Sequence, residues 1–71
     1  MLRRKKVVIC AYYRQFVDWC RENNVPPSQA IYADSREKIL GLELKKEDIV
    51  YTGTPPENLH LIERELLLRI R

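Results

Sequence analysis

The chain is poor in the residues on which most catalytic and cofactor sites depend. It has one histidine, two cysteines and two glycines among 71 residues. With His60 as the only imidazole, we expect neither a histidine-based metal centre nor a nucleophile–histidine triad. Cys10 and Cys20 are too few for a disulfide scaffold, and they show neither CxxC nor zinc-ligand spacing. We expect two reduced, buried thiols and no bound metal.

Glycine-rich phosphate loops are also missing. Neither GxGxxG nor GxxxxGK[ST] occurs, and the segment after the first apolar run reads AYYRQ, where two tyrosines would keep a pyrophosphate away from the backbone. The carboxylates are scattered, so no general acid–base pair stands out. The sequence therefore favours a protein that is not an enzyme and that carries no cofactor.

Long apolar runs are absent too. The longest run near the N-terminus, residues 7–11, is far too short for a signal peptide or a membrane span. A chain of this length is expected to form one domain over residues 1–71. We expect that domain to be cytoplasmic, without membrane contact.

The basic residues are unevenly distributed. Arg3, Arg4, Lys5 and Lys6 are four of the thirteen, and the remaining nine face ten acidic residues, a net charge of −1 for the rest of the chain. Residues 1–5 therefore form a basic N-terminal arm, which could contact nucleic-acid phosphates. The alternative is that these charges flank a buried strand and keep it soluble and in register.

Three short apolar segments alternate with helical patterns. The segments that predict strands are residues 6–11 (KVVICA), 30–33 (AIYA) and 48–52 (DIVYT). No hairpin signal separates them, which favours parallel strands joined by right-handed crossovers. We predict an α/β fold of three layers, βαβαβα, resembling half of a Rossmann or flavodoxin domain. The uniformly apolar first strand should lie in the centre, in strand order 2-1-3.

Helix starts and stops are readable between these strands. Residues 12–24 have helical spacing. Asp34 and Glu37 have the spacing of a capping box, which predicts a short helix closed near Gly41. Thr54 followed by prolines and Glu57 has the pattern of an N-cap, predicting a last helix over residues 55–70.

The last helix has apolar residues on more than one side. Its predicted core stripe consists of Leu59, Ile62, Leu66 and Ile70. Leu67 flanks this stripe, whereas Leu61 and Leu68 lie nearly opposite and are candidates for a partner interface. Scattered exposed leucines are the alternative. Tyr12 and Trp19 form a second candidate patch, or else the edge of the core.

Ligands of open parallel sheets bind beyond the carboxyl ends of the strands. With order 2-1-3, the crevice lies between the loops that follow the first and third strands. Arg14, Thr52 and Thr54 would line it beside two helix N-termini, a combination suited to a phosphate, a carboxylate or a nucleotide fragment. The competing interpretation is that Thr54 only caps a helix.

The layout resembles small proteins encoded by bacteriophages, especially those of actinobacteria. The resembling segments are KVVIC, YRQFVDWCREN, AIYADSREKILGL and DIVYTGT, which cover nearly the full chain. The resemblance implies a half-Rossmann fold and an accessory protein in the cytoplasm of an infected cell, and it implies no site residues. Our preferred hypothesis is a small interaction module that forms a homodimer or binds a host protein. Nucleic-acid binding through the arm and anion binding at the strand ends are the alternatives.

Overall fold

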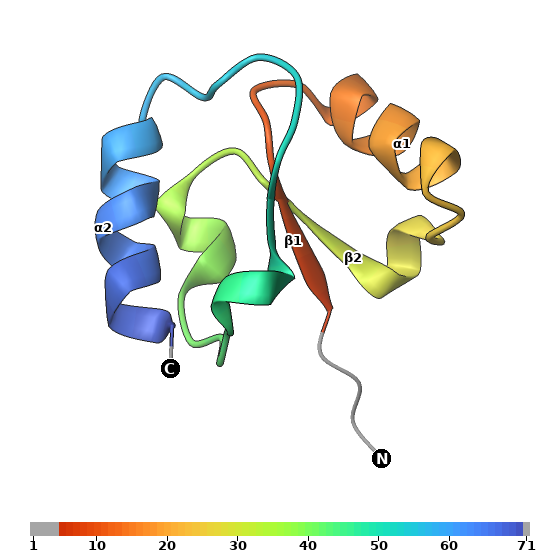
Figure 1. Cartoon of the computed structure of the whole chain (residues 1–71). Coiled ribbons are helices and arrows are strands. Elements are labelled where there is room, and N and C mark those ends of the chain that lie inside the picture. The colour runs from red at the N-terminus through yellow and green to blue at the C-terminus, as the bar shows by residue number, and fades with distance from the viewer. Residues whose placement is uncertain (1–4, 71) are drawn as a thin grey trace.

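The computed structural model describes residues 5–70 and has the predicted α/β topology. Its sheet contains β1 (Lys6–Ile9), β2 (Ala30–Ala33) and β3 (Ile49–Tyr51), all parallel, in the order β2-β1-β3 (Figure 1). Val8 of β1 is level with Tyr32 on one neighbour and with Val50 on the other. The prediction of a central first strand is confirmed, and residues 7–9 are almost completely buried because both faces of β1 are covered.

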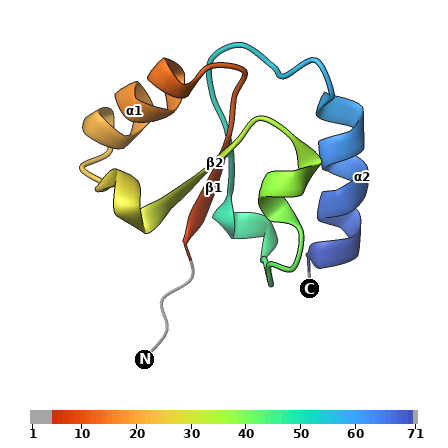
Figure 2. The same cartoon turned by 180° about the vertical axis from the view of Figure 1, so that it is seen from behind.

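Helices cover the two faces of this sheet. Helix α1 (Tyr13–Glu22) lies on one face, and α2 (Leu59–Arg69) lies on the other together with a short 3-10 turn, η2 (Arg36–Ile39) (Figures 1 and 2). Two further 3-10 turns, η1 (Pro27–Gln29) and η3 (Lys46–Asp48), precede β2 and β3. The three predicted layers are therefore present, with a 3-10 turn where a second helix was expected.

Each face has its own core because strand side chains alternate. The core on the α1 side consists of Val8, Cys10, Phe16, Cys20 and Ala30. The core on the α2 side consists of Val7, Ile9, Ala33, Ile39, Leu44, Ile62 and Leu66. Cys10 and Cys20 are buried free thiols, as expected. Burial raises the pKa of both, so they are core residues rather than reactive ones.

The predicted capping box at Asp34 is wrong. Ser35 precedes the first residue of η2 and makes no side-chain cap hydrogen bond. Asp34 lies beside Tyr32 instead, and its Oδ1 is buried without a hydrogen-bond partner in the described part of the chain. The element is a four-residue 3-10 turn that ends just before Gly41, which has a φ of +78°. An element this short has no full α-helical turn for a capping box to stabilise.

The predicted start of the last helix is also wrong. Helix α2 begins at Leu59, with Asn58 as its N-cap, instead of at residue 55. A proline disfavours the α region for the residue before it, so Pro56 disfavours a helical conformation at Pro55. Pro56 is itself buried. Residues 52–58 form the connection that carries the chain from the end of β3 to α2 (Figure 1).

Candidate functional site

The crevice predicted at the carboxyl ends of β1 and β3 is closed by hydrogen bonds. The Ala11 N–H donates to the Thr54 carbonyl oxygen at 2.8 Å. The Gln15 side chain donates from Nε2 to Thr54 Oγ1 at 3.0 Å, and its Oε1 accepts from the Thr54 N–H at 3.0 Å. Thr54 therefore binds a glutamine 39 residues earlier in the chain and does not cap α2.

Two of the three predicted anion-binding residues already donate their backbone N–H groups within the chain. The Thr54 N–H donates to Gln15, while Thr54 Oγ1 accepts from Gln15, and the Thr52 N–H donates to the Ile9 carbonyl at 3.2 Å. Arg14 is exposed on α1. A hollow does exist at this end of the sheet, lined by Ala11, Tyr12, Asp34, Pro56, Glu57 and Asn58. Its two carboxyl groups would repel a phosphate or a carboxylate, so this geometry gives the anion hypothesis no support.

The basic arm is only partly within the described residues. Arg3 and Arg4 lie outside them. Lys5 is exposed, and Lys6 is the first residue of β1, where its Nζ donates to the Glu47 carbonyl at 2.9 Å. Lys6 thus ties the start of the sheet to the turn before β3, which matches the alternative that it holds the strand in place. Nucleic-acid binding by the arm stays a prediction.

The aromatic residues of α1 are divided between surface and core. Tyr12 is 62% exposed, whereas Trp19 is half-buried at the edge of the core on the α1 side. The ring contacts of this region join Tyr13, Phe16 and Tyr32, with centroids 5.4–5.6 Å apart. Trp19 therefore has the edge-of-core position that the sequence offered as an alternative to an interface patch.

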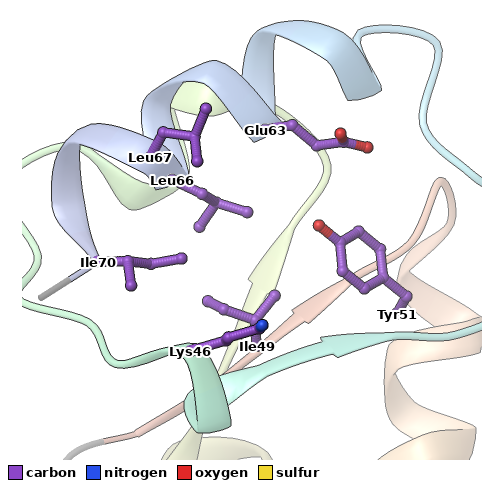
Figure 3. Close-up of a pocket in the computed structure, with 7 residues that line it drawn as sticks. All are labelled: Lys46, Ile49, Tyr51, Glu63, Leu66, Leu67 and Ile70. Atoms are coloured by element: carbon purple, nitrogen blue, oxygen red, sulfur yellow. The ribbon is translucent and has the colours of Figure 1, made fainter.

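An apolar groove runs between β3 and α2 at the open edge of the sheet (Figure 3). We call it the β3–α2 groove; it is lined by Lys46, Ile49, Tyr51, Glu63, Leu66, Leu67 and Ile70. Ile49 and Tyr51 project from β3 toward α2 because alternate residues of a strand share a face (Figure 3). The volume of the groove is about 360 Å³, and it is open along one side. Its open side leaves the lining side chains accessible to another protein surface.

The groove is apolar along its length and charged at its two ends. Lys46 lies beside Ile49 and below Ile70, at the end where β3 begins, and Glu63 lies on α2 above the Tyr51 ring, where β3 ends (Figure 3). Burial, together with the negative charge of Glu63, raises the pKa of the Tyr51 hydroxyl. The hydroxyl therefore stays protonated at neutral pH and remains available as a hydrogen-bond donor.

The outer side of α2 presents exposed leucines next to this groove. Leu67 and Leu68 are each 78% exposed, and Leu61 is half-buried. The predicted interface residues Leu61 and Leu68 line one hollow together with Leu67 and three charged residues, Arg36, Arg64 and Glu65. Leu67, which the sequence placed beside the core stripe, lines the groove next to Leu66 but is itself largely exposed. Compared with the predicted orientation, α2 is rotated about its own axis so that Glu65, which is only 9% exposed, lies on the buried side. The same rotation places Leu67 on the exposed side.

Searches of the chain against protein-family models, curated proteins and solved structures found no match in any of the three. The resemblance to bacteriophage proteins therefore stays a prediction. Between residues 5 and 70 no group of three or more histidine, cysteine or acidic side chains is placed to hold a metal ion. In the same part of the chain, neither helix is long and apolar enough to span a membrane.

Proposed function

We propose that the chain is a small, non-enzymatic interaction module that associates with a second copy of itself through the β3–α2 groove and the exposed leucines beside it. One observation carries this proposal. Leu67 and Leu68 are each 78% exposed next to an apolar groove at an open sheet edge. Leu67 lines the groove itself, and Leu68 lines the neighbouring hollow. Isolated exposed leucines are common, but exposed leucines beside an apolar groove are typical of a contact site.

The energetics favour covering this surface. Burying a leucine side chain fully is worth about 1.5–3 kcal/mol. A domain of this length buries only about 60% of the surface of its unfolded chain, so its stability as a monomer is small. An open sheet edge also presents unpaired backbone groups that bind another strand readily. Self-association through α2 would cover the exposed leucines beside this edge.

The same proposal includes a cytoplasmic location and the absence of catalysis. Two free, buried thiols fit a reducing compartment, where disulfides are rare. The place where a parallel sheet usually binds its ligand is occupied by the Gln15–Thr54 hydrogen bonds. The groove, on the side of the sheet, offers apolar side chains that a partner could bury.

Molar mass in solution tests this function. Light scattering after size exclusion, at two protein and two salt concentrations, should give a dimer whose population rises with protein concentration. Leu67→Glu should convert it to a monomer with an unchanged circular-dichroism spectrum, because Leu67 is already exposed and a charge there is buried only on association.

Leu40→Glu is the matched control. Leu40 is 49% exposed and lines neither the groove nor the neighbouring hollow, so its replacement should leave the dimer intact. A wild-type chain that is monomeric at every concentration, or a Leu67→Glu variant with the wild-type mass distribution, would contradict the proposal.

A further inference from the structure

The exposed side of α2 has an acidic border and a basic border. Successive residues of a helix project about 100° apart, so Glu63 and Arg64 diverge, and Leu67 lies between them about one turn further along the helix. All three side chains are exposed. Glu63 lines the β3–α2 groove, whereas Arg64 lines the hollow on the other side of the helix, beside Leu68. Leu67 lines both and therefore forms a ridge between two borders of opposite charge.

We propose that two copies of the chain pack with their α2 helices side by side and parallel, about a two-fold axis that runs along the Leu67 ridge. This inference rests on the proposed self-association and specifies its geometry. An axis parallel to the helices brings the groove side of each α2 against the hollow side of the other. Glu63 of each copy then lies across from the partner's Arg64, and the dimer contains this ion pair twice.

The positions of the two charges distinguish the two possible helix directions. A two-fold axis perpendicular to the helices would make them antiparallel, and each side of α2 would then face the same side of its partner. The two Glu63 carboxylates would share one border of the contact, and the two Arg64 guanidinium groups would share the other. Only the parallel arrangement brings opposite charges together. Charge complementarity therefore selects the parallel pair.

The other charged residues beside α2 are compatible with this pairing. On the hollow side, Arg36 adds a second positive charge, and the Glu65 carboxylate already accepts from Arg69 at 2.8 Å. On the groove side, Lys46 lies at the opposite end from Glu63, where β3 begins (Figure 3). The acidic end of each groove thus meets a hollow that contains two arginines.

The same axis matches the apolar side chains. Leu67 lies on the axis and packs against the partner's Leu67, and His60, seven residues earlier, continues the exposed ridge. Leu68 projects toward the hollow and Ile70 lines the groove, so Leu68 of one copy faces the partner's Ile70. Leu67 and Leu68 are each 78% exposed in the single chain. The contact therefore removes from water the apolar surface that the monomer leaves exposed.

Charge reversal tests the arrangement. Glu63→Arg places two guanidinium groups across from each other at both ion-pair positions, and Arg64→Glu places two carboxylates there. Each single variant should raise the dimer dissociation constant about tenfold, measured by sedimentation equilibrium at low salt. Mixing the two single variants should restore near-wild-type affinity, because both ion-pair positions of the heterodimer then join opposite charges.

Glu22→Arg provides the matched control. Glu22 is an exposed acidic residue at the end of α1, on the other face of the sheet, and its reversal changes the net charge by the same amount as Glu63→Arg. The dissociation constant of this variant should stay within about twofold of the wild-type value. Thermal unfolding of each variant checks that the fold is retained.

Cysteine cross-linking tests the helix direction independently. Packed helices have axes about 8–10 Å apart, which brings residues that face each other on a two-fold axis within the range that a disulfide spans. Leu67→Cys should therefore form a covalent dimer under mild oxidation. Leu40→Cys, at an exposed position that lines neither the groove nor the hollow, should not. Cys10 and Cys20 are buried and should not compete.

The outcomes separate this geometry from the proposed function. An antiparallel contact has like charges on both borders in the wild type and in either single variant, so neither reversal would weaken it. A wild-type dimer that both single variants leave unchanged, and whose Leu67→Cys form does not cross-link, would overturn the parallel α2 pair while leaving self-association in place. A wild-type monomer at all concentrations would overturn both. Weakening by each reversal, rescue on mixing and cross-linking at residue 67 would establish the parallel pair.

Discussion

The hydrogen bonds between Gln15 and Thr54 make a double-mutant cycle informative. Replacing Gln15 by alanine removes both of its bonds to Thr54, each 3.0 Å long. A neutral hydrogen bond contributes about 0.5–1.5 kcal/mol net. Both groups are partly accessible to water, which satisfies the orphaned Thr54 N–H in part. We therefore expect Gln15→Ala to lower the free energy of unfolding by about 1–2 kcal/mol.

The Thr54→Ala variant isolates one of the two bonds. It removes the Oγ1 acceptor but keeps the backbone N–H that donates to Gln15. Its cost should be about 0.5–1 kcal/mol, and the double variant should show a coupling energy of similar size, measured by urea unfolding. If Thr54 instead capped a helix, the Thr54→Ala substitution would lower the free energy of unfolding by about 1 kcal/mol and show no coupling to Gln15. A coupling energy of zero would refute the reasoning.

Three further predictions concern the core and the ionisable groups. Ile62→Ala should lower the free energy of unfolding by about 2–5 kcal/mol in denaturant titration, because Ile62 is the fully buried residue on the core side of α2. Burial raises the pKa values of Cys10, Cys20 and Tyr51, so the folded chain holds these protons more tightly than the unfolded chain. The free energy of unfolding should therefore be undiminished at neutral pH and fall as the pH rises above about 8.5, which unfolding curves at several pH values would show. Glu63→Gln should lower the pKa of Tyr51 part of the way to its ordinary value, seen as a shift in ultraviolet titration, because burial remains when the charge is removed.

The sheet was predictable because its signals are redundant. The run VVI is apolar at every position, which suits a strand covered on both faces and excludes an edge position. Once that strand is central, alternating strands and crossovers leave few arrangements for the other two. The buried thiols followed from the same pattern, since Cys10 ends the apolar run and Cys20 shares a helical face with Phe16.

The helix boundaries were less predictable because a cap depends on more than its own spacing. Thr54, Pro55 and Glu57 have the residue types of a helix start, but Pro56 follows Pro55 and disfavours a helical conformation there. The partner of Thr54 is Gln15, which lies in a different part of the sequence. At Asp34 the capping pattern yields to a position beside Tyr32. At Thr54 a tertiary contact outweighs a local preference of about 1 kcal/mol, whereas at Asp34 the competing contact is with a residue only two positions earlier.

The exposed face of α2 was identified only in part because an apolar stripe does not determine how a helix is rotated. Leucine and isoleucine occur on several sides of α2, so the stripe could be centred in more than one way. The structure buries Glu65, whose Oε2 accepts from Arg69 Nε at 2.8 Å, and an ion pair of this kind allows a carboxylate to lie at the margin of the core. The rotation that accommodates Glu65 leaves Leu61 half-buried and turns Leu67 toward the open edge of β3. The apolar pattern alone would place Glu65 on the exposed side of α2. Its burial accompanies the orientation of α2 in which Leu67 lines the groove.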